Sequence, residues 1–572
     1  MCYNVQNRRI LMHIICVRRE AHLIRQSMIW RILRALLLIV FLPVVFCVVI
    51  IGNNMDYSEK LKLATRLPNQ VLLLIALAGM VFCIFLFWKS KNVVLSFRAN
   101  WITNGVLALI FLALYYVNVW VAKQIAFNLP WDIMITRGVA YEIAHERPLE
   151  YFFYLSMYTN NIPISYILGR LYRKAMEMQS YPYVYDFIWI QVNCALISIA
   201  GFFSCLLVKK LTKKLMPVIA VFLLYLVLVG ISPWKIAPYT DTYGLIFPII
   251  CIYFYVCYRK AERLWSKYLC LLLSIAAGMV GGFIKPNLYI VVIAILGNEF
   301  VCFLADYKKI WQFVLTEIIL AVVLAGGGEV YKNHIIDEIG LDINKEIEAS
   351  WQCYFYMGLN EEATGSYSDD LSLITGEFQT SKSDKNRAAL ERAFTRMKDR
   401  GFWGSIYFYL KKMVMTFNDG LFGWKTEVWI HEEYPAEITS NTALTQRLRS
   451  IFWGNELSYD VGGYNALCQL TWIFSIMGIP GICLCKDKKK EDYSIFIICF
   501  LGIFFYQMLF EARARYLFVF LPVLLPIAIC GIQQYMYFIT SAIQKRKQKA
   551  CNVLQDNVVS DNYGEVNFND KK

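Results

Sequence analysis

The chain has 572 residues, of which 58% are hydrophobic and 17% are charged, and its formal net charge is +14. An ordinary soluble domain carries roughly 25% charged residues, so this composition excludes a soluble globular protein. The basic residues are scattered along connectors rather than gathered in one soluble domain, which argues against a nucleic-acid partner.

Apolar stretches of about 17 to 25 residues recur along the chain, and a helix of that length can cross a membrane. They predict an all-α polytopic membrane protein with about twelve transmembrane helices surrounded by membrane lipids. The expected spans are 35–52, 70–88, 101–121, 183–208, 216–231, 242–258, 267–283, 286–304, 310–329, 466–485, 493–510 and 516–538.

These spans divide the chain into regions of different composition. In chain order they are a basic amino-terminal segment (1–34), a transmembrane region (35–329) with a first long loop (122–182), a second long segment of helical character (330–465), the carboxy-terminal spans (466–540) and a polar tail that is predicted to be disordered (541–572).

Clusters of lysine and arginine lie in every second gap between the spans, for example at 209–214, 259–267 and 486–490. Because positive charge resists translocation, these gaps and both termini are expected to face the cytoplasm of a multi-pass cell-membrane protein. The long segments 122–182 and 330–465 are then extracytoplasmic. Most of the 17 cysteines lie inside spans, and the five histidines are not paired at ligand spacing, so no built-in zinc or haem site is expected.

Asp132 is the first candidate catalytic residue on the outer side. It follows Leu129-Pro130-Trp131 a few residues beyond a span. A carboxylate at the water–lipid boundary can act as a general base toward a sugar hydroxyl. Because apolar residues follow Asp132 at helical spacing, the alternative is that it caps a helix lying along the interface.

Asp241 is the second candidate, in the short outward gap Pro238-Tyr239-Thr240-Asp241-Thr242. Two outward carboxylates near one interface are a candidate pair for acceptor activation or for binding a divalent metal ion. The alternative is that Asp241 caps the span beginning at Thr242. Metal dependence stays open at this point.

Polar groups that suit a sugar or a phosphate occur elsewhere on the predicted outer side. Tyr158-Thr159-Asn160-Asn161 offers hydrogen-bonding groups, although two amides before a proline are also typical of a turn. Lys285 lies between two apolar runs, where a lysine must find a partner, such as a phosphate, or snorkel to the headgroups. The segment 402–418 combines aromatic residues with lysines and predicts a helix on, or re-entering, the membrane surface.

The last outward gap contains Glu511, Arg513 and Arg515. Two arginines on the outside run against the charge bias that the other gaps obey. Arginine presents a planar fork that matches phosphate oxygens, and Glu511 can hold one of the two arginines in place. We therefore interpret this gap as a second anion-binding point, and the alternative is that the arginines only anchor the chain at the membrane interface.

In their order along the chain, these motifs resemble the GT-C superfamily of integral-membrane glycosyltransferases, and more narrowly a Gram-positive group of multi-span proteins placed among them. The resemblance covers about residues 100–525. It departs from the Gram-positive pattern at Thr159, where proline is expected, and from the superfamily in having a single acid in the first loop. The motifs that carry it are Asp132, Tyr158-Thr159-Asn160-Asn161, Pro238 through Thr242, Ile284-Lys285-Pro286, Met357-Gly358-Leu359-Asn360 and Glu511 through Tyr516.

The resemblance implies GT-C-like outer loops and a sugar donor linked to a lipid phosphate. By the same resemblance, Asp132 is the catalytic base and Asp241 a second acid of the site. Further residues are expected to bind the substrates, the three cations among them by holding the donor phosphate: Tyr158, Asn160, Asn161, Tyr239, Lys285, Glu511, Arg513 and Arg515.

We therefore expect a membrane glycosyltransferase that moves one sugar from a polyprenyl-phosphate-linked donor to a cell-surface glycan or lipid acceptor on the outer face. Two alternatives remain open. A polysaccharide polymerase would transfer preassembled units, and a lipid-linked glycan transporter should carry ionisable groups in the middle of its spans. The sequence contains neither a Walker loop nor a GxGxxG motif after a strand, which agrees with a donor that is not a nucleotide sugar.

Overall fold

The computed structural model describes residues 28–51, 67–178, 187–305, 330–370, 381–427, 432–433, 442–453, 461–485 and 490–564, with four isolated residues between 310 and 318. Within these ranges the chain is almost entirely helical. A two-residue antiparallel pairing joins β1 (Phe127–Asn128) to β2 (Glu432–Glu433). The predicted all-α class is confirmed.

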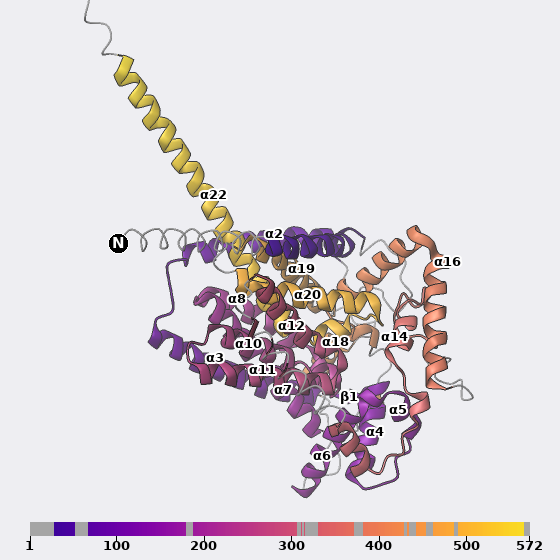
Figure 1. Ribbon diagram of the computed structural model, residues 1–572. Coiled ribbons are helices and arrows are strands. Elements are labelled where there is room, and N and C mark those ends of the chain that lie inside the picture. The colour runs from indigo at the N-terminus through magenta and orange to yellow at the C-terminus, as the bar shows by residue number, and fades with distance from the viewer. Residues whose placement is uncertain are drawn as a thin grey trace, which may run out of the picture.

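The described helices form a bundle whose members run mostly side by side (Figure 1). The first helix covers Met28–Ile50 and ends in a π-helical turn, η1 (Cys47–Ile51). The next elements are α2 (Asn69–Lys89), α3 (Phe97–Ile125), α4 (Asp132–Ala144), α5 (Phe152–Met157), η3 (Thr159–Asn161), α6 (Ile162–Glu177), α7 (Phe187–Thr212), α8 (Leu215–Tyr225), η5 (Leu226–Gly230), η6 (Pro233–Ile236), α9 (Thr240–Tyr243), α10 (Ile246–Lys260), α11 (Leu264–Ile284), η7 (Pro286–Leu288) and α12 (Tyr289–Ala305).

The carboxy-terminal part of the chain adds the helices of the second long segment and the last apolar helices of the bundle. These elements are η9 (Lys345–Ile347), α14 (Trp351–Met357), α16 (Lys382–Phe417), α17 (Trp424–Glu427), α18 (Ala443–Phe452), α19 (Val461–Gly478), η10 (Ile479–Leu484), α20 (Lys490–Leu509), α21 (Arg515–Phe518) and α22 (Leu521–Gly564).

Nine helices among the described residues are long and apolar enough to cross a membrane. The helix α11 illustrates the pattern: Arg263 and Lys285 bracket 21 residues that are largely apolar, which at 1.5 Å per residue is about the thickness of the hydrocarbon layer. The predicted spans 216–231 and 493–510 form shorter apolar helices. The predicted span 310–329 lies mostly outside the described residues.

The first half of α22 forms the centre of the bundle. Its apolar side chains from Leu521 to Ile532 are almost completely buried, and it packs against α7, α8, α19 and η10. A helix that is apolar on every side is stable only when it is surrounded by protein or lipid. By contrast, α2 and α3 expose many large apolar side chains, among them Leu74 and Leu109, as expected of helices that face lipid.

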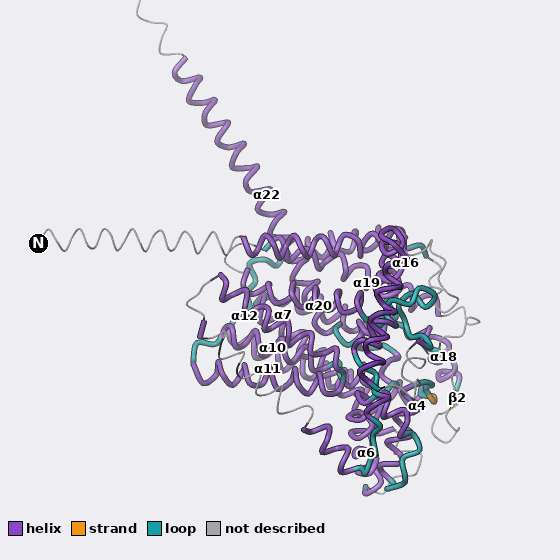
Figure 2. The backbone as a smooth tube through the Cα atoms, turned by 45° about the vertical axis from the view of Figure 1, so that its right-hand side comes forward, coloured by secondary structure: helices purple, strands orange, loops and turns teal. Residues whose placement is uncertain are grey.

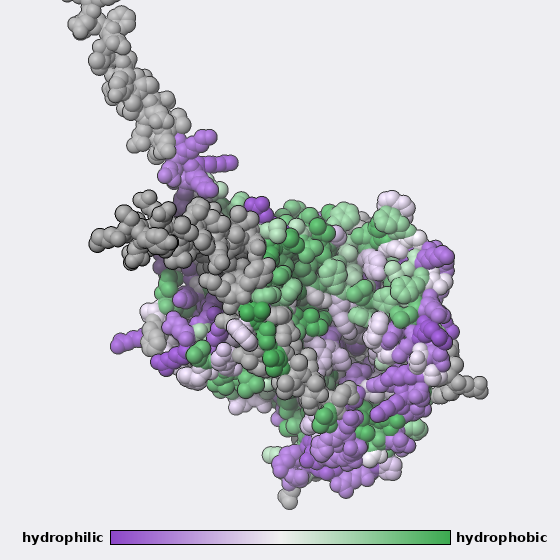
Figure 3. Space-filling view, in the orientation of Figure 1, coloured by the Kyte–Doolittle hydropathy of each residue, from purple (hydrophilic) through white to green (hydrophobic). Residues whose placement is uncertain are grey.

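The two ends of the bundle carry different elements. At one end, Lys214 donates to the carbonyl of Lys91, Leu95 donates to the carbonyl of Lys213 at 3.1 Å, and α10 ends at Lys260. The opposite end carries α4, α5, α6, α14 and α16, which lie toward the right and the bottom of Figure 1, and Figure 2 shows α4, α6 and α16 at the same end in a second view. Hydrophilic side chains gather over α16 and over the α4–α6 end, whereas apolar ones cover the middle of the bundle (Figure 3).

Two predicted boundaries are refined by the structure. The predicted interfacial helix 402–418 is the second half of α16, which bends at Gly401 because this residue adopts a φ of +65°. Residues 541–564, predicted to be disordered, continue α22 as a helix. The segment 541–550 lacks glycine and proline and is rich in glutamine, lysine and arginine, which favour helix.

Candidate active site

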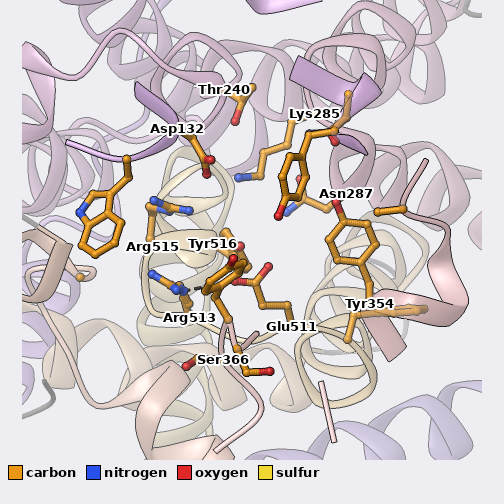
Figure 4. Close-up of a pocket in the computed structure, with 18 of the residues that line it drawn as sticks. Asp132, Thr240, Lys285, Asn287, Tyr354, Ser366, Glu511, Arg513, Arg515 and Tyr516 are labelled. Carbon is orange, nitrogen blue, oxygen red and sulfur yellow. Dashed lines mark ion pairs between the residues drawn. The ribbon is translucent and has the colours of Figure 1, made fainter. Parts of the chain in front are cut away.

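A cavity of about 1170 Å³ lies at the end of the bundle that carries α4 and α14. Figure 4 shows Asp132, Lys285, Arg513 and Arg515 arranged around it. Its lining contains every predicted site residue except Asp241, namely Asp132, Tyr158, Asn160, Asn161, Tyr239, Lys285, Glu511, Arg513 and Arg515. Segments far apart in the sequence therefore meet at one place.

Asp132 is the first residue of α4 and is partly exposed. Its carboxylate accepts a hydrogen bond from the hydroxyl of Tyr154 at 2.7 Å and a longer one from the hydroxyl of Tyr239 at 3.3 Å. The residue before it, Trp131, has a φ of +69° and no side chain caps the helix. The alternative reading of Asp132 as a helix cap is therefore wrong, because its carboxylate is turned to the tyrosines.

Asn161 orders the two tyrosines that hold Asp132. Its side chain is buried; Nδ2 donates to Tyr154 Oη at 2.6 Å, and Oδ1 accepts from Asn160 Nδ2 at 3.1 Å. Tyr239 Oη lies 3.3 Å from both Asn161 Oδ1 and Asp132 Oδ2, so its one proton is shared between these two acceptors. Burial raises the pKa of Tyr154 and of Tyr239 well above the usual value, so both remain neutral phenols. Neutral donors thus fix the Asp132 carboxylate without cancelling its charge.

Asp241 lies behind the cavity lining rather than on it, and 1% of its side chain is exposed. Lys285 Nζ is 2.5 Å from its Oδ1, and Arg515 Nε is 3.5 Å from its Oδ2. Burial lowers the pKa of Lys285, and the neighbouring Asp241 acts in the opposite direction. Asp241 is in the first turn of α9, whose cap is Tyr239, so the alternative that Asp241 caps the following span is wrong.

The cations of the cavity are held in place by acids and aromatic rings. Arg513 Nε is 3.2 Å from Glu511 Oε1, as the sequence predicts for this gap. Lys285 Nζ lies 4.5 Å from the centre of the Tyr516 ring. Fixed positive groups that need no rearrangement are well suited to bind an anion.

One wall of the cavity comes from the segment 351–370, which contains the predicted motif at 357–360. Tyr354 and Tyr367 line it, and Asp370 is fixed by both terminal nitrogens of Arg396 at 2.8 and 2.9 Å. Burial acts to raise the pKa of Asp370, but hydrogen bonds from Arg396 and Asn360 outweigh it and lower the pKa.

Lys412 fastens this wall to the bundle. It is fully buried in α16, and its ammonium donates to the carbonyls of Gly358 at 2.5 Å, Met508 at 2.9 Å and Phe510 at 2.7 Å. A Cβ atom at Gly358 would lie 2.5 Å from the backbone of Phe510, so only glycine permits this close approach. The tie therefore fixes the chain directly before Glu511.

Tyr154 and Lys412 were not among the predicted site residues. Tyr154 lies 22 positions from Asp132, and Lys412 lies 98 positions from Phe510. No local spacing rule connects residues so far apart, so their roles become visible only in the folded chain.

The expected pair of outward carboxylates is not assembled as a metal site, because both oxygens of Asp241 face Lys285 and Arg515. In the described parts of the chain, no three histidine, cysteine, aspartate or glutamate side chains gather in a way that could hold a metal ion.

The helical bundle and its charged cavity define an integral membrane protein that crosses the membrane many times. A family model described as a conserved hypothetical integral membrane protein matches residues 25–536, so the chain belongs to this family. Comparisons with curated proteins and with solved structures found no match.

Proposed function

We propose that the protein is a GT-C-type membrane glycosyltransferase, which transfers a sugar from a polyprenyl-phosphate-linked donor to a cell-surface glycan or lipid acceptor. One observation carries the proposal: a partly exposed carboxylate held by neutral tyrosines shares a cavity with Lys285, Arg513 and Arg515. A base and an anion-binding cluster are the two groups that transfer from a lipid phosphate requires.

In the proposed reaction, Asp132 removes the proton from the acceptor hydroxyl. The acceptor oxygen then forms a bond to the anomeric carbon of the donor sugar, while the bond from that carbon to the phosphate oxygen breaks. The departing lipid phosphate takes the bonding electrons, and Lys285, Arg513 and Arg515 stabilise its charge. Trp131, among the aromatic side chains that line the cavity, offers a face on which a sugar ring can stack.

The proposed orientation follows from the charges at the two ends of the bundle. The cavity lies at the end opposite to the lysines near 91 and 209–214. By the positive-inside rule the basic end faces the cytoplasm, together with both termini, and the cavity opens on the outer face of the cell membrane.

The proposed twelve-span topology includes a span at 310–329, which lies mostly outside the described residues. The turn η7 begins beside the cavity at Pro286, and α12 runs from it toward the basic end, where it finishes at Ala305. Residues from 349 onward line the cavity again. By its length and apolar composition, the sequence stretch 310–329 is the one we assign to the crossing between these two ends.

The charge distribution favours transfer over transport. Glu299, a buried acid within the spans, pairs with Arg259 at 3.1 Å and accepts from Tyr255 at 2.5 Å. Arg259 is the penultimate residue of α10, so this pair belongs to the basic end and not to the cavity. A transport path would require ionisable groups that connect the two ends.

The proposal is tested with the purified full-length protein, polyprenyl-phosphate sugars and a membrane glycan extract. We expect transfer by the wild type and by Asp342→Asn, a control at an exposed acid outside the cavity, and its loss in Asp132→Asn. Undiminished transfer by Asp132→Asn would remove Asp132 from the mechanism. Transfer from a nucleotide sugar but not from a lipid donor would overturn the donor assignment, and transfer of preassembled units would identify a polymerase.

A further inference from the structure

Asn287 lines the cavity beside Lys285 but was not among the predicted site residues. Its side chain is 4% exposed, and neither Oδ1 nor Nδ2 has a hydrogen-bond partner among the described residues. Figure 4 shows it on the same side of the cavity as Lys285. It is thus a buried amide that borders the cavity with both of its polar atoms unused.

A buried amide without a partner is costly. Leaving such a group unsatisfied costs about 1–3 kcal/mol, and the large majority of buried polar groups in native structures have a partner. The backbone at Asn287 is well fixed, because Pro286 begins the turn η7 and Leu288 donates to the carbonyl of Lys285 at 2.9 Å. An amide held at this cost in a cavity wall is explained by a ligand that supplies its hydrogen bonds.

We propose that Asn287 contacts the ligand directly and forms, together with Lys285, a subsite for one phosphate group. The amide Nδ2 can donate to a phosphate oxygen, and the ammonium of Lys285 supplies the opposite charge. Oδ1 can accept from a hydroxyl of the attached group. The amide of Asn287 and the ammonium of Lys285 together favour a phosphate monoester or diester. A carboxylate or a neutral sugar alone would form fewer interactions with these two groups.

The position of the subsite points to a phosphate carried by a lipid. Pro286 borders the cavity and is exposed, and Ile293, two turns further along α12, is 63% exposed on a membrane-spanning helix. A hydrocarbon chain attached to a phosphate at Asn287 can therefore reach lipid beside α12. The identity of this lipid as a sugar donor rests on the proposed function, whereas the phosphate subsite does not.

The subsite is tested by binding to the purified full-length protein in detergent, using undecaprenyl phosphate, undecaprenol and inorganic phosphate as probes. Asn287→Leu removes the amide, and Asn287→Asp also adds a negative charge. Asn344→Asp is the control, since it makes the same charge change at an exposed residue whose cap to the Glu346 N–H an aspartate can keep. Each variant is measured for affinity and for its melting temperature without ligand.

We expect Asn287→Leu to weaken undecaprenyl phosphate binding about tenfold, the loss of roughly one hydrogen bond to a charged group, and Asn287→Asp to weaken it further. Undecaprenol binding and the Asn344→Asp variant should be unaffected. The unliganded Asn287→Leu protein should melt at the same or a higher temperature, because no hydrogen bond is lost.

Unchanged affinity in Asn287→Leu, or a lower melting temperature without ligand, would overturn the subsite and make Asn287 a structural residue. Equally tight, Asn287-dependent binding of inorganic phosphate would support the subsite and assign it to soluble phosphate. Asn287-dependent binding without sugar transfer from any donor would contradict the proposed function alone. If sugar transfer is lost in Asp132→Asn but unchanged in Asn287→Leu, the subsite alone would be contradicted.

Discussion

Asp132 and Asp241 lie at the same end of the bundle, yet their surroundings differ in almost every respect. Asp132 is partly exposed on the cavity wall, and tyrosine hydroxyls hold it. Asp241 is 1% exposed behind that wall, between the ammonium of Lys285 and the guanidinium of Arg515. Their charges are therefore available to different degrees.

This difference assigns the two acids different tasks. Neutral phenols orient a carboxylate and leave its charge and part of its hydrogen-bonding capacity for a ligand. Two cations instead neutralise a buried carboxylate and are themselves fixed by it. We infer that Asp132 acts on the ligand, whereas Asp241 keeps Lys285 and Arg515 in place.

The largest expected effect concerns activity at Asp132. Replacing a general base typically lowers turnover by about 10²–10⁴-fold, and we expect this loss for Asp132→Asn in the transfer assay. Because the amide can still accept from Tyr154, the melting temperature should change little. A large drop in stability would instead show that Asp132, like Asp241, is a structural acid.

Asp241→Asn should show the reverse pattern. Removing one partner of a buried ion pair leaves uncompensated charge, and we expect a loss of about 3–5 kcal/mol in the free energy of unfolding. The measurement is denaturation in detergent, with Asp342→Asn as the control at an exposed acid. Equal stability of Asp241→Asn and the control would contradict the counter-ion role.

Lys412→Met sharpens the comparison because it acts on the chain that carries the arginines. The change leaves buried carbonyls without a donor, and we expect it to cost at least about 2 kcal/mol of stability. The rate of sugar transfer should fall, because the segment after Phe510 is misplaced. The hydrogen bonds from the two tyrosines to Asp132 should not change. Wild-type transfer by Lys412→Met would show that the tie does not position the site.

Lys412 also predicts a pH dependence of stability. Burial lowers its pKa from 10.5 to about 7, and the nearby Glu511 partly opposes this. Between these two values the unfolded chain binds a proton that the folded chain has lost, so the free energy of unfolding rises with pH in this window. Comparing wild type with Lys412→Met from pH 7 to pH 9 should show a steeper rise in the wild type.

The smallest expected effects separate the two tyrosines that hold Asp132. Tyr154 donates at 2.7 Å and Tyr239 at 3.3 Å. A hydrogen bond to a charged group contributes about 1.5–3 kcal/mol, so Tyr154→Phe should lower transfer by at least about tenfold. Tyr239→Phe should have a weaker effect. The opposite ranking would mean that Tyr239 is the main support of the carboxylate.

Sequence alone predicted those properties that depend on local composition. Most spans were found because hydropathy is summed over neighbouring residues, and Lys285 was selected because a cation between two apolar runs is unusual. The burial of Asp241, by contrast, depends on Arg515, which is 274 positions away along the chain. The unsatisfied amide of Asn287 likewise cannot be predicted from a motif. Whether an amide has hydrogen-bond partners depends on which residues the fold places around it.

The attachment of the cavity wall by Lys412 has a consequence for how this protein can vary. All three acceptors of the Lys412 ammonium are main-chain oxygens. Side chains such as those of Met508 and Phe510 can therefore be substituted without loss of the hydrogen bonds from Lys412, provided that the path of the main chain is kept. The cavity wall formed by 351–370 is therefore held on the helical bundle by one lysine and by the course of the backbone, rather than by a set of matched side chains.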